Sequence, residues 1–163
     1  MYDQDLVRKD PSVKYLFKQF KAKAEVVFVC YRKEVRGIIK KIRIYDFKVE
    51  GRKKFLEKLY ILYFFKPDSI EAVKQHITID DDVVEEHLGL IHHKEDRLQI
   101  PDDILQKCFN EKTAITITMR NGHVLKGKIH SFGIFSIRLQ IDKKNRVIIF
   151  RHAIYDLEYK KTA

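Results

Sequence analysis

The stretch AITITMRNGHVLKGKIHSFGIFSIRLQIDKKNRVIIFRHAIYDLEY, residues 114–159, decides the fold. Apolar Ile115, Ile117 and Met119 alternate with polar residues, as in a half-buried strand. Asn121 and Gly122 then mark a tight hairpin, because these residue types accept the positive φ angles that two-residue turns require. Gly127, in the middle of the return strand, indicates a sharp bend or a bulge. The stretch therefore predicts about five short antiparallel strands, the content of a small barrel.

A short helix is expected before these strands and a second one near the N-terminus. PDDILQKCFNEK begins with Pro101 at a position that favours a helix start, and the acidic Asp102 and Asp103 follow it. DPSVKYLFKQFKAK has Asp10 as an N-cap and Pro11 at the first helical position. Both segments carry apolar residues at helical spacing, so each predicts a helix with one buried face.

Residues 9–73 repeat the order of residues 101–159, a helix followed by strands. A shift of ninety residues aligns VRGIIKKIRIYDFKV with LKGKIHSFGIFSIRL and places Tyr45 on Phe135. On this alignment LYILYFF is expected to be the fourth strand and SIEAV the fifth. The sequence thus predicts a mainly β protein with two tandem units, at residues 9–73 and 101–159, joined by the segment 74–100.

Charge changes sign along the chain. Residues 1–73 hold 18 Lys and Arg against 10 Asp and Glu, residues 74–100 hold 3 against 7, and residues 101–163 hold 12 against 6. Two basic pieces suggest a polyanion as the partner, with nucleic acid as the first candidate. A surface of thermophile type explains the high charge content, but it explains the net charge of +10 less well.

The acidic segment 74–100 does not have the composition of a flexible linker. It contains no Pro or Ser and only one Gly, and its Ile, Val and Leu residues indicate that it packs on another part of the protein. A short helix is expected to begin around the cluster 80–82.

Other classes of protein find little support. No apolar run approaches the roughly 20 residues of a membrane span, and the first residues do not resemble a signal peptide, so a cytoplasmic protein is expected. Cys30 and Cys108 are expected to be reduced core residues, with a disulfide as the alternative. His87, His92 and His93 lack the spacing of a metal site, and no phosphate loop or nucleophile motif occurs. We therefore expect no metal, no cofactor and no catalysis.

The order of these features resembles the bacterial Sm-like RNA chaperone Hfq. A short helix, an Asn-Gly hairpin, a Gly-bent strand, an S-F-x-x-F turn and a strand ending in F-R-H-A-I carry the resemblance, well over 101–159 and more weakly over 10–73. It implies that each unit is a strongly bent five-stranded antiparallel sheet, a small open barrel, whose outer strands pair with neighbouring units. Hfq rings hold six units, so it further implies a pseudo-hexameric ring of three copies that binds U-rich or A-rich single-stranded RNA.

The resemblance also implies site residues in the second unit. Phe135 would stack on a base, His152 would approach the ribose or base edge, and Arg151 would supply positive charge. An aromatic platform beside cations is a common way to bind single-stranded RNA. In the first unit Tyr45 would stand for the aromatic and Lys66 for the basic residue, while residues 67–69 replace the histidine.

Two further surfaces follow from the same resemblance. On the opposite face, the family's tyrosine in the first strand corresponds here to Phe28 or to Thr118, of which only Phe28 could stack on a base. On the rim, basic helix residues of the first unit would contact RNA, and these are Lys14, Lys18 and Lys21.

Each of these residues also has a purely structural interpretation. Phe135 is equally consistent with barrel core, and His152 with a turn residue whose ring is bonded to the backbone. A lysine stripe is often only a solvated helix face. The alternative function is therefore a degenerate Sm-like scaffold for oligomerisation and protein binding with little RNA binding, and a DNA-binding small barrel is a weaker third.

Overall fold

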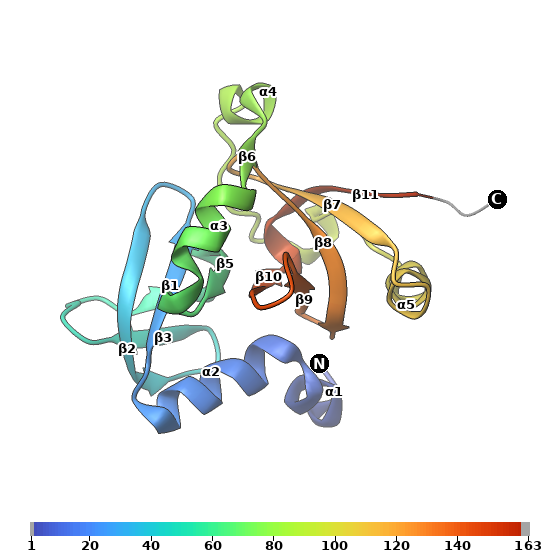
Figure 1. The fold of residues 1–163 in the computed structure, drawn as a ribbon. Helices are drawn as coiled ribbons and strands as arrows, with labels where there is room; N and C mark the ends of the chain where they lie inside the picture. Colours follow the sequence, from blue (N-terminus) through green and yellow to red (C-terminus); the bar gives the residue numbers. More distant parts are fainter. Residues whose placement is uncertain (1, 161–163) are drawn as a thin grey trace.

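The computed structural model describes residues 2–160, and its strands form one open antiparallel sheet. Their order is β11-β7-β8-β9-β10-β5-β1-β2-β3-β4, with β6 paired to β8 (Figure 1). The prediction of a mainly β fold is confirmed, and the sheet does not close on itself. The strands are β1 (Glu25–Cys30), β2 (Glu34–Ile42), β3 (Asp46–Val49), β4 (Leu56–Glu57), β5 (Ile61–Phe65), β6 (Thr78–Ile79), β7 (Ala114–Met119), β8 (His123–Phe132), β9 (Ser136–Gln140), β10 (Arg146–Phe150) and β11 (Ile154–Tyr159).

The two expected helices are present, and Asp10 caps the first of them as the sequence predicts. The Asp10 carboxylate accepts a hydrogen bond from the Ser12 N–H, and Pro11 takes the first helical position. A short extra helix, α1, precedes this cap. In Figure 1, α2 runs beneath both groups of strands, and it packs against β2, β9 and β10. The helices are α1 (Gln4–Lys9), α2 (Pro11–Ala22), α3 (Ile70–His76), α4 (Asp81–Glu85) and α5 (Asp102–Asn110), and the 3₁₀ turns are η1 (Lys58–Tyr60), η2 (Pro67–Ser69), η3 (Lys94–Asp96) and η4 (Arg151–Ala153).

The strand assignment expected for the first half is wrong by one strand. β5 pairs with β1 through Phe28 and Phe64, just as β11 pairs with β7, so Ile61–Phe65 is a fifth strand. The fourth strand is the two-residue β4. SIEAV is helical rather than extended, because Pro67 has no backbone N–H for a strand ladder and opens a 3₁₀ turn that runs into α3.

The two halves of the sheet join where β10 pairs with β5. The register places Ile148 opposite Phe64 and Ile149 opposite Tyr63. Every residue of β5 is buried, as are five of the six residues of β1, because both faces of these strands are covered. Each of the two apolar cores consequently contains residues from both halves, and the halves pack as one body.

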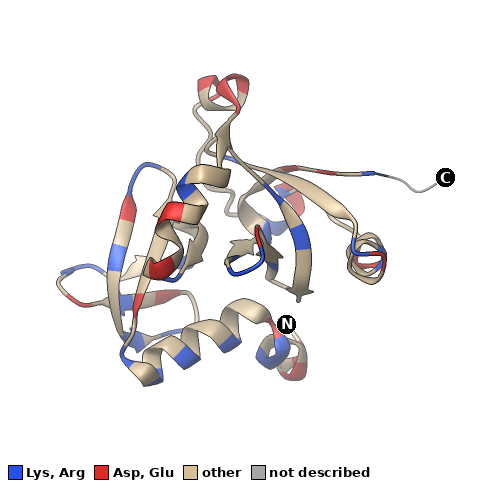
Figure 2. Cartoon of the chain, in the orientation of Figure 1, with Lys and Arg blue, Asp and Glu red and all other residues tan. Residues whose placement is uncertain are grey.

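The acidic segment packs on the sheet, as its composition predicts. β6 adds to β8 at the start of that strand, and Asp80 caps α4 by accepting from the N–H groups of Asp82 and Val83. Gly122, at a φ of +92°, lies so close to α4 that an added Cβ would meet Val84 at 2.4 Å. Figure 2 shows the acidic positions of α4, in red, at the tip of this projection. No helix within residues 2–160 is long and apolar enough to cross a membrane.

Candidate nucleic-acid interface

Phe135 lies in the turn between β8 and β9, at the junction of the two halves. It is only partly buried and belongs to neither apolar core. Its carbonyl oxygen accepts a hydrogen bond of 2.8 Å from the Arg151 N–H, which fixes this turn against η4. The ring of Tyr2 meets the Phe135 ring edge-on with centroids 4.9 Å apart, and Lys94 Nζ lies 4.4 Å from the Tyr2 ring centroid. The aromatic surface at this turn is therefore made by two rings and bordered by a cation.

The Arg151 guanidinium is held by the protein itself. It donates to the carbonyl oxygens of Gly133 at 2.9 Å and Ile100 at 2.7 Å, and its Nη1 lies 3.0 Å from Asp102 Oδ1. Because only 18% of the side chain is exposed, most of its hydrogen-bonding capacity is used inside the junction. Arg151 thus positions the Phe135 turn and contributes a partly neutralised charge.

His152 reaches across the junction to the first half. Its ring stacks on Phe150 with centroids 4.9 Å apart, and its Nε2 lies 3.0 Å from the carbonyl oxygen of Ile61 on β5. Burial lowers the pKa of His152 to about 4, the bond to Ile61 raises it in part, and the charge of Arg97 lowers it further. The ring is neutral at pH 7 and donates through Nε2–H. The contacts of His152 are thus those of a turn residue whose ring is bonded to the backbone. Because it lies at the junction beside the Phe135 turn, His152 also remains a candidate site residue.

Asp10 links the first helix to the Phe135 turn over more than a hundred residues of sequence. The carboxylate is fully buried and accepts from the N–H groups of Phe135 at 2.8 Å and Ser136 at 3.1 Å, and from Ser136 Oγ at 2.8 Å. Ser12 donates to it through both its N–H and its hydroxyl. The position of the aromatic side chain in the second half is therefore set by a residue of the first half.

The corresponding position in the first half contains a different set of residues. The Lys58 N–H donates to the Tyr45 carbonyl at 2.8 Å, the same backbone bond that joins Arg151 to Phe135. Lys58 is consequently the counterpart of Arg151, and Leu59 stands where the second half has His152. Tyr45 is 79% exposed, next to the open edge at β4.

Three expected residues lie elsewhere. Lys66 follows β5, beyond the position of Lys58, so its assignment as the basic partner of Tyr45 is wrong. Phe28 is fully buried and stacks on Phe47 in the apolar core, so it has no face to offer a base. Thr118 is also buried, in β7.

The lysine stripe of α2 is exposed, as its spacing predicts. These side chains are Lys14, Lys18 and Lys21. Basic positions lie along α2 in Figure 2, in blue. Asp10 ties the start of this helix to the Phe135 turn.

Sequence reasoning missed Tyr2, Lys58 and the long-range role of Asp10. Lys58 could have been found by aligning KLYI with RHAI, which requires a gap of three residues in the preceding loop. Tyr2 and Asp10 carry no local signal of their contacts, because their partners lie far away in the sequence.

Comparison with known proteins assigns the second half to a family. A family model described as Hfq protein matches residues 100–162. The RNA-binding protein Hfq of Anoxybacillus flavithermus is 32% identical over 57 residues, which cover 35% of this chain and 76% of that protein. The chain belongs to the Hfq family. The RNA-binding protein Hfq of Leptospira biflexa is 40% identical over 55 residues, covering 34% of this chain and 65% of its own length. A crystal structure of the pleiotropic translational regulator Hfq aligns over its whole length with 43% of this chain, at 24% identity and a TM-score of 0.35.

Proposed function

We propose that this Hfq family member is a cytoplasmic, non-catalytic protein that binds single-stranded RNA and assembles as a ring. The observation that carries the proposal is the junction between β10 and β5. It places Phe135, His152 and the Ile61 carbonyl around one turn, with residues of both halves contributing. An aromatic surface beside cations is well suited to stack and hold an unpaired base.

The proposal includes two units in tandem, residues 9–73 and 101–159, with 74–100 as an inserted segment. Each unit has a helix, four strands, a 3₁₀ turn and a fifth strand that pairs with its own first strand. The matching backbone bonds from Lys58 to Tyr45 and from Arg151 to Phe135 support the same division.

The open sheet supports assembly into a ring. Within the chain, the fourth strand of the second unit pairs with the fifth strand of the first. The two ends of the sheet are β4 and β11, which are a fourth and a fifth strand and would pair between copies in the same way. Exposed apolar residues adjoin the β4 end; these are Ile44, Tyr45 and Tyr60. Three copies would close a ring of six units.

Light scattering of the purified chain tests this assembly. We expect a mass of about 58 kDa, three times the chain's 19.5 kDa. Replacing Ile44 with glutamate should shift the population toward monomer, because a charge would then enter the buried contact between copies. A wild-type chain that remains monomeric at high concentration would contradict the ring.

Phe135→Ala is expected to weaken the binding of single-stranded RNA about 5- to 150-fold, since a stacked base contributes roughly 1–3 kcal/mol. Fluorescence anisotropy with oligo-U, oligo-A and single-stranded DNA measures this loss and the base preference. Phe109→Ala is the matched control, because Phe109 is an exposed phenylalanine on α5 outside the junction. Equal RNA affinity of the Phe135→Ala and wild-type oligomers would remove Phe135 from the site.

A scaffold function is the second candidate, and two observations favour it. Leu59 replaces the histidine in the first unit, and the Arg151 guanidinium is already engaged with Gly133, Ile100 and Asp102. In that case the wild-type ring would form while its affinity for all three nucleic acids stayed weak and nearly independent of salt.

A further inference from the structure

A group of basic side chains lies on the face of the sheet that α2 covers, at the junction of the two units. Ile148 on β10 belongs to the apolar core under α2, and Arg138 on β9 lies directly opposite it. Arg146 is two residues from Ile148 and Lys66 is two residues from Phe64, so both extend the same face beyond the core. We call Arg138, Arg146, Lys66 and His130 the junction cluster.

His130 and α2 complete the surroundings of this cluster. A bulge in β8 between Ile129 and Ser131 leaves His130 outside the regular ladder, beside Arg138. The Arg138 guanidinium carbon lies 5.9 Å from the ring centroid of Tyr15 on α2. The cluster therefore draws on β8, β9, β10 and the end of β5, with α2 beside it, so both units contribute.

Polar atoms of the cluster and of the adjacent Tyr15 lack partners. Within residues 2–160, buried Tyr15 Oη, His130 Nδ1 and Arg138 Nε have no hydrogen-bond partner. Tyr15 itself is only 6% exposed. Buried polar groups are nearly always hydrogen-bonded, and leaving one unsatisfied costs about 1–3 kcal/mol. All three atoms can donate a hydrogen bond, so their grouping indicates that a hydrogen-bond acceptor is missing from this site.

The charges around the cluster have the same sign. Within the described residues, no acidic side chain forms an ion pair with Arg138, Arg146 or Lys66. Burial lowers the pKa of Arg138, and the neighbouring Arg146 lowers it further; burial, Arg146 and Arg138 lower the pKa of His130. The acidic group facing Tyr15 is Asp68, whose side chain is exposed at η2. Positive charge thus predominates where the two units meet.

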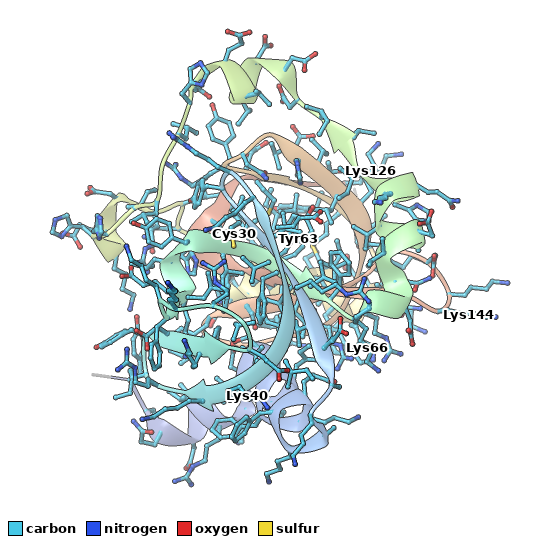
Figure 3. The ribbon with its side chains drawn as sticks, turned by 90° about the vertical axis from the view of Figure 1, so that its left-hand side faces the viewer. Cys30, Lys40, Tyr63, Lys66, Lys126 and Lys144 are labelled. Carbon is cyan, nitrogen blue, oxygen red and sulfur yellow. The ribbon has the colours of Figure 1, made fainter. Side chains whose placement is uncertain are left out.

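We propose that the junction cluster binds a phosphate group of the single-stranded RNA backbone, and so adds a contact on the flank of the chain to the aromatic surface at Phe135. This rests on the proposed RNA binding. Two guanidinium groups suit a phosphate because their planar N–H donors match its oxygens, and a phosphate also supplies the missing negative charge. Figure 3 shows Lys144 projecting from this flank, on which Lys66 is also labelled. RNA that follows it would contact both units of one chain.

The test is the salt dependence of RNA binding by the full-length chain carrying Arg138→Gln and Arg146→Gln. If each arginine meets one phosphate, the slope of log K against log salt should become shallower by about 1.4, twice the 0.7 per contact of a single strand. The matched control carries Arg36→Gln and Lys40→Gln, which remove the same charge from β2, where these residues pair with Glu25 and Glu50. Slopes that change equally in the two double variants would overturn the proposal.

Inorganic phosphate provides the second arm of the experiment. At constant ionic strength it should raise the Tm of the wild type and of the Arg36 and Lys40 control, but not that of the junction variant. A phosphate effect at the cluster without any change in RNA affinity would overturn the RNA assignment and leave a site for free phosphate. If the wild type itself shows no salt-dependent RNA binding, the proposed function fails, and the phosphate arm alone decides whether the anion site exists.

Discussion

Replacing Asp10 with alanine is expected to lower the free energy of unfolding by about 4 kcal/mol. Its carboxylate is fully buried and accepts hydrogen bonds from three backbone N–H groups and two hydroxyls, on Ser12, Phe135 and Ser136. Hydrogen bonds to a charged group contribute about 1.5–3 kcal/mol each, and each buried donor left unsatisfied costs about 1–3 kcal/mol, although these costs do not add fully. Urea denaturation measures the loss.

Asp3→Ala is the matched control for this prediction. Asp3 caps α1 by accepting from the Asp5 N–H, but it is exposed and has no long-range partner among the described residues. An ordinary cap contributes about 1 kcal/mol, so the difference between the two variants isolates the contacts across the junction. Gly133→Ala should act in the same direction, because its Cβ would lie 2.5 Å from Asp10 Oδ1. Similar losses for Asp3→Ala and Asp10→Ala would show that Asp10 serves only as a helix cap.

Asp10 also illustrates how far the sequence alone can predict this structure. Its place before Pro11 predicts a helix cap, because capping depends on neighbours two or three residues away, and the structure confirms it. The bonds to Phe135 and Ser136 span 125 and 126 residues, and no local pattern encodes them. The local helix cap was thus predictable here, while the contact between the two halves of the chain was not.

The first half of the chain shows why an alignment of the two halves could place a strand wrongly. ILYFF is apolar at every position because both faces of β5 are covered, so it has no alternation that distinguishes a fourth strand from a fifth. The decisive feature is the short turn η1 before it, which matches η4. Because the loop before β4 differs in length, a fixed shift of ninety residues passes over Lys58.

Candidate site residues in the second half could be named from the sequence, whereas the groups that contact them could not. The family resemblance predicts Arg151 and His152 as site residues. Both lie at the junction, and their role in binding stays a prediction. Whether Arg151 is free to meet a phosphate depends on the carbonyl groups of Gly133 and Ile100, which only the folded chain brings to it. A family resemblance therefore predicts where a residue lies in the fold more safely than what that residue does.

His152 is expected to make the protein about 3 kcal/mol less stable at pH 4 and below than at neutral pH. Burial lowers its pKa from 6.5 to about 4 in the folded state. Each tenfold change in proton affinity between the unfolded and folded states corresponds to about 1.36 kcal/mol of stability. Above pH 6.5 the ring is neutral in both states, so its contribution is complete. Between pH 6.5 and 4 the unfolded chain binds the proton and the folded chain does not, so stability falls as the pH is lowered.

His152→Gln isolates this contribution, because glutamine can still donate to the Ile61 carbonyl but does not titrate in this range. Urea titrations between pH 4 and 7.5 give the free energy of unfolding at each pH. As the pH is lowered, this free energy should fall less steeply in the variant than in the wild type. The difference in slope should correspond to nearly one bound proton. Burial also lowers the pKa values of His123 and His130, which adds pH dependence to both proteins. Subtracting the variant curve from the wild-type curve removes this shared contribution. His93→Gln, on an exposed residue before η3, should follow the wild type. Parallel stability curves for His152→Gln and the wild type would contradict this prediction, because they would mean that His152 binds its proton equally well in the folded and unfolded states. The ring would then be charged near pH 6 and could contact a phosphate.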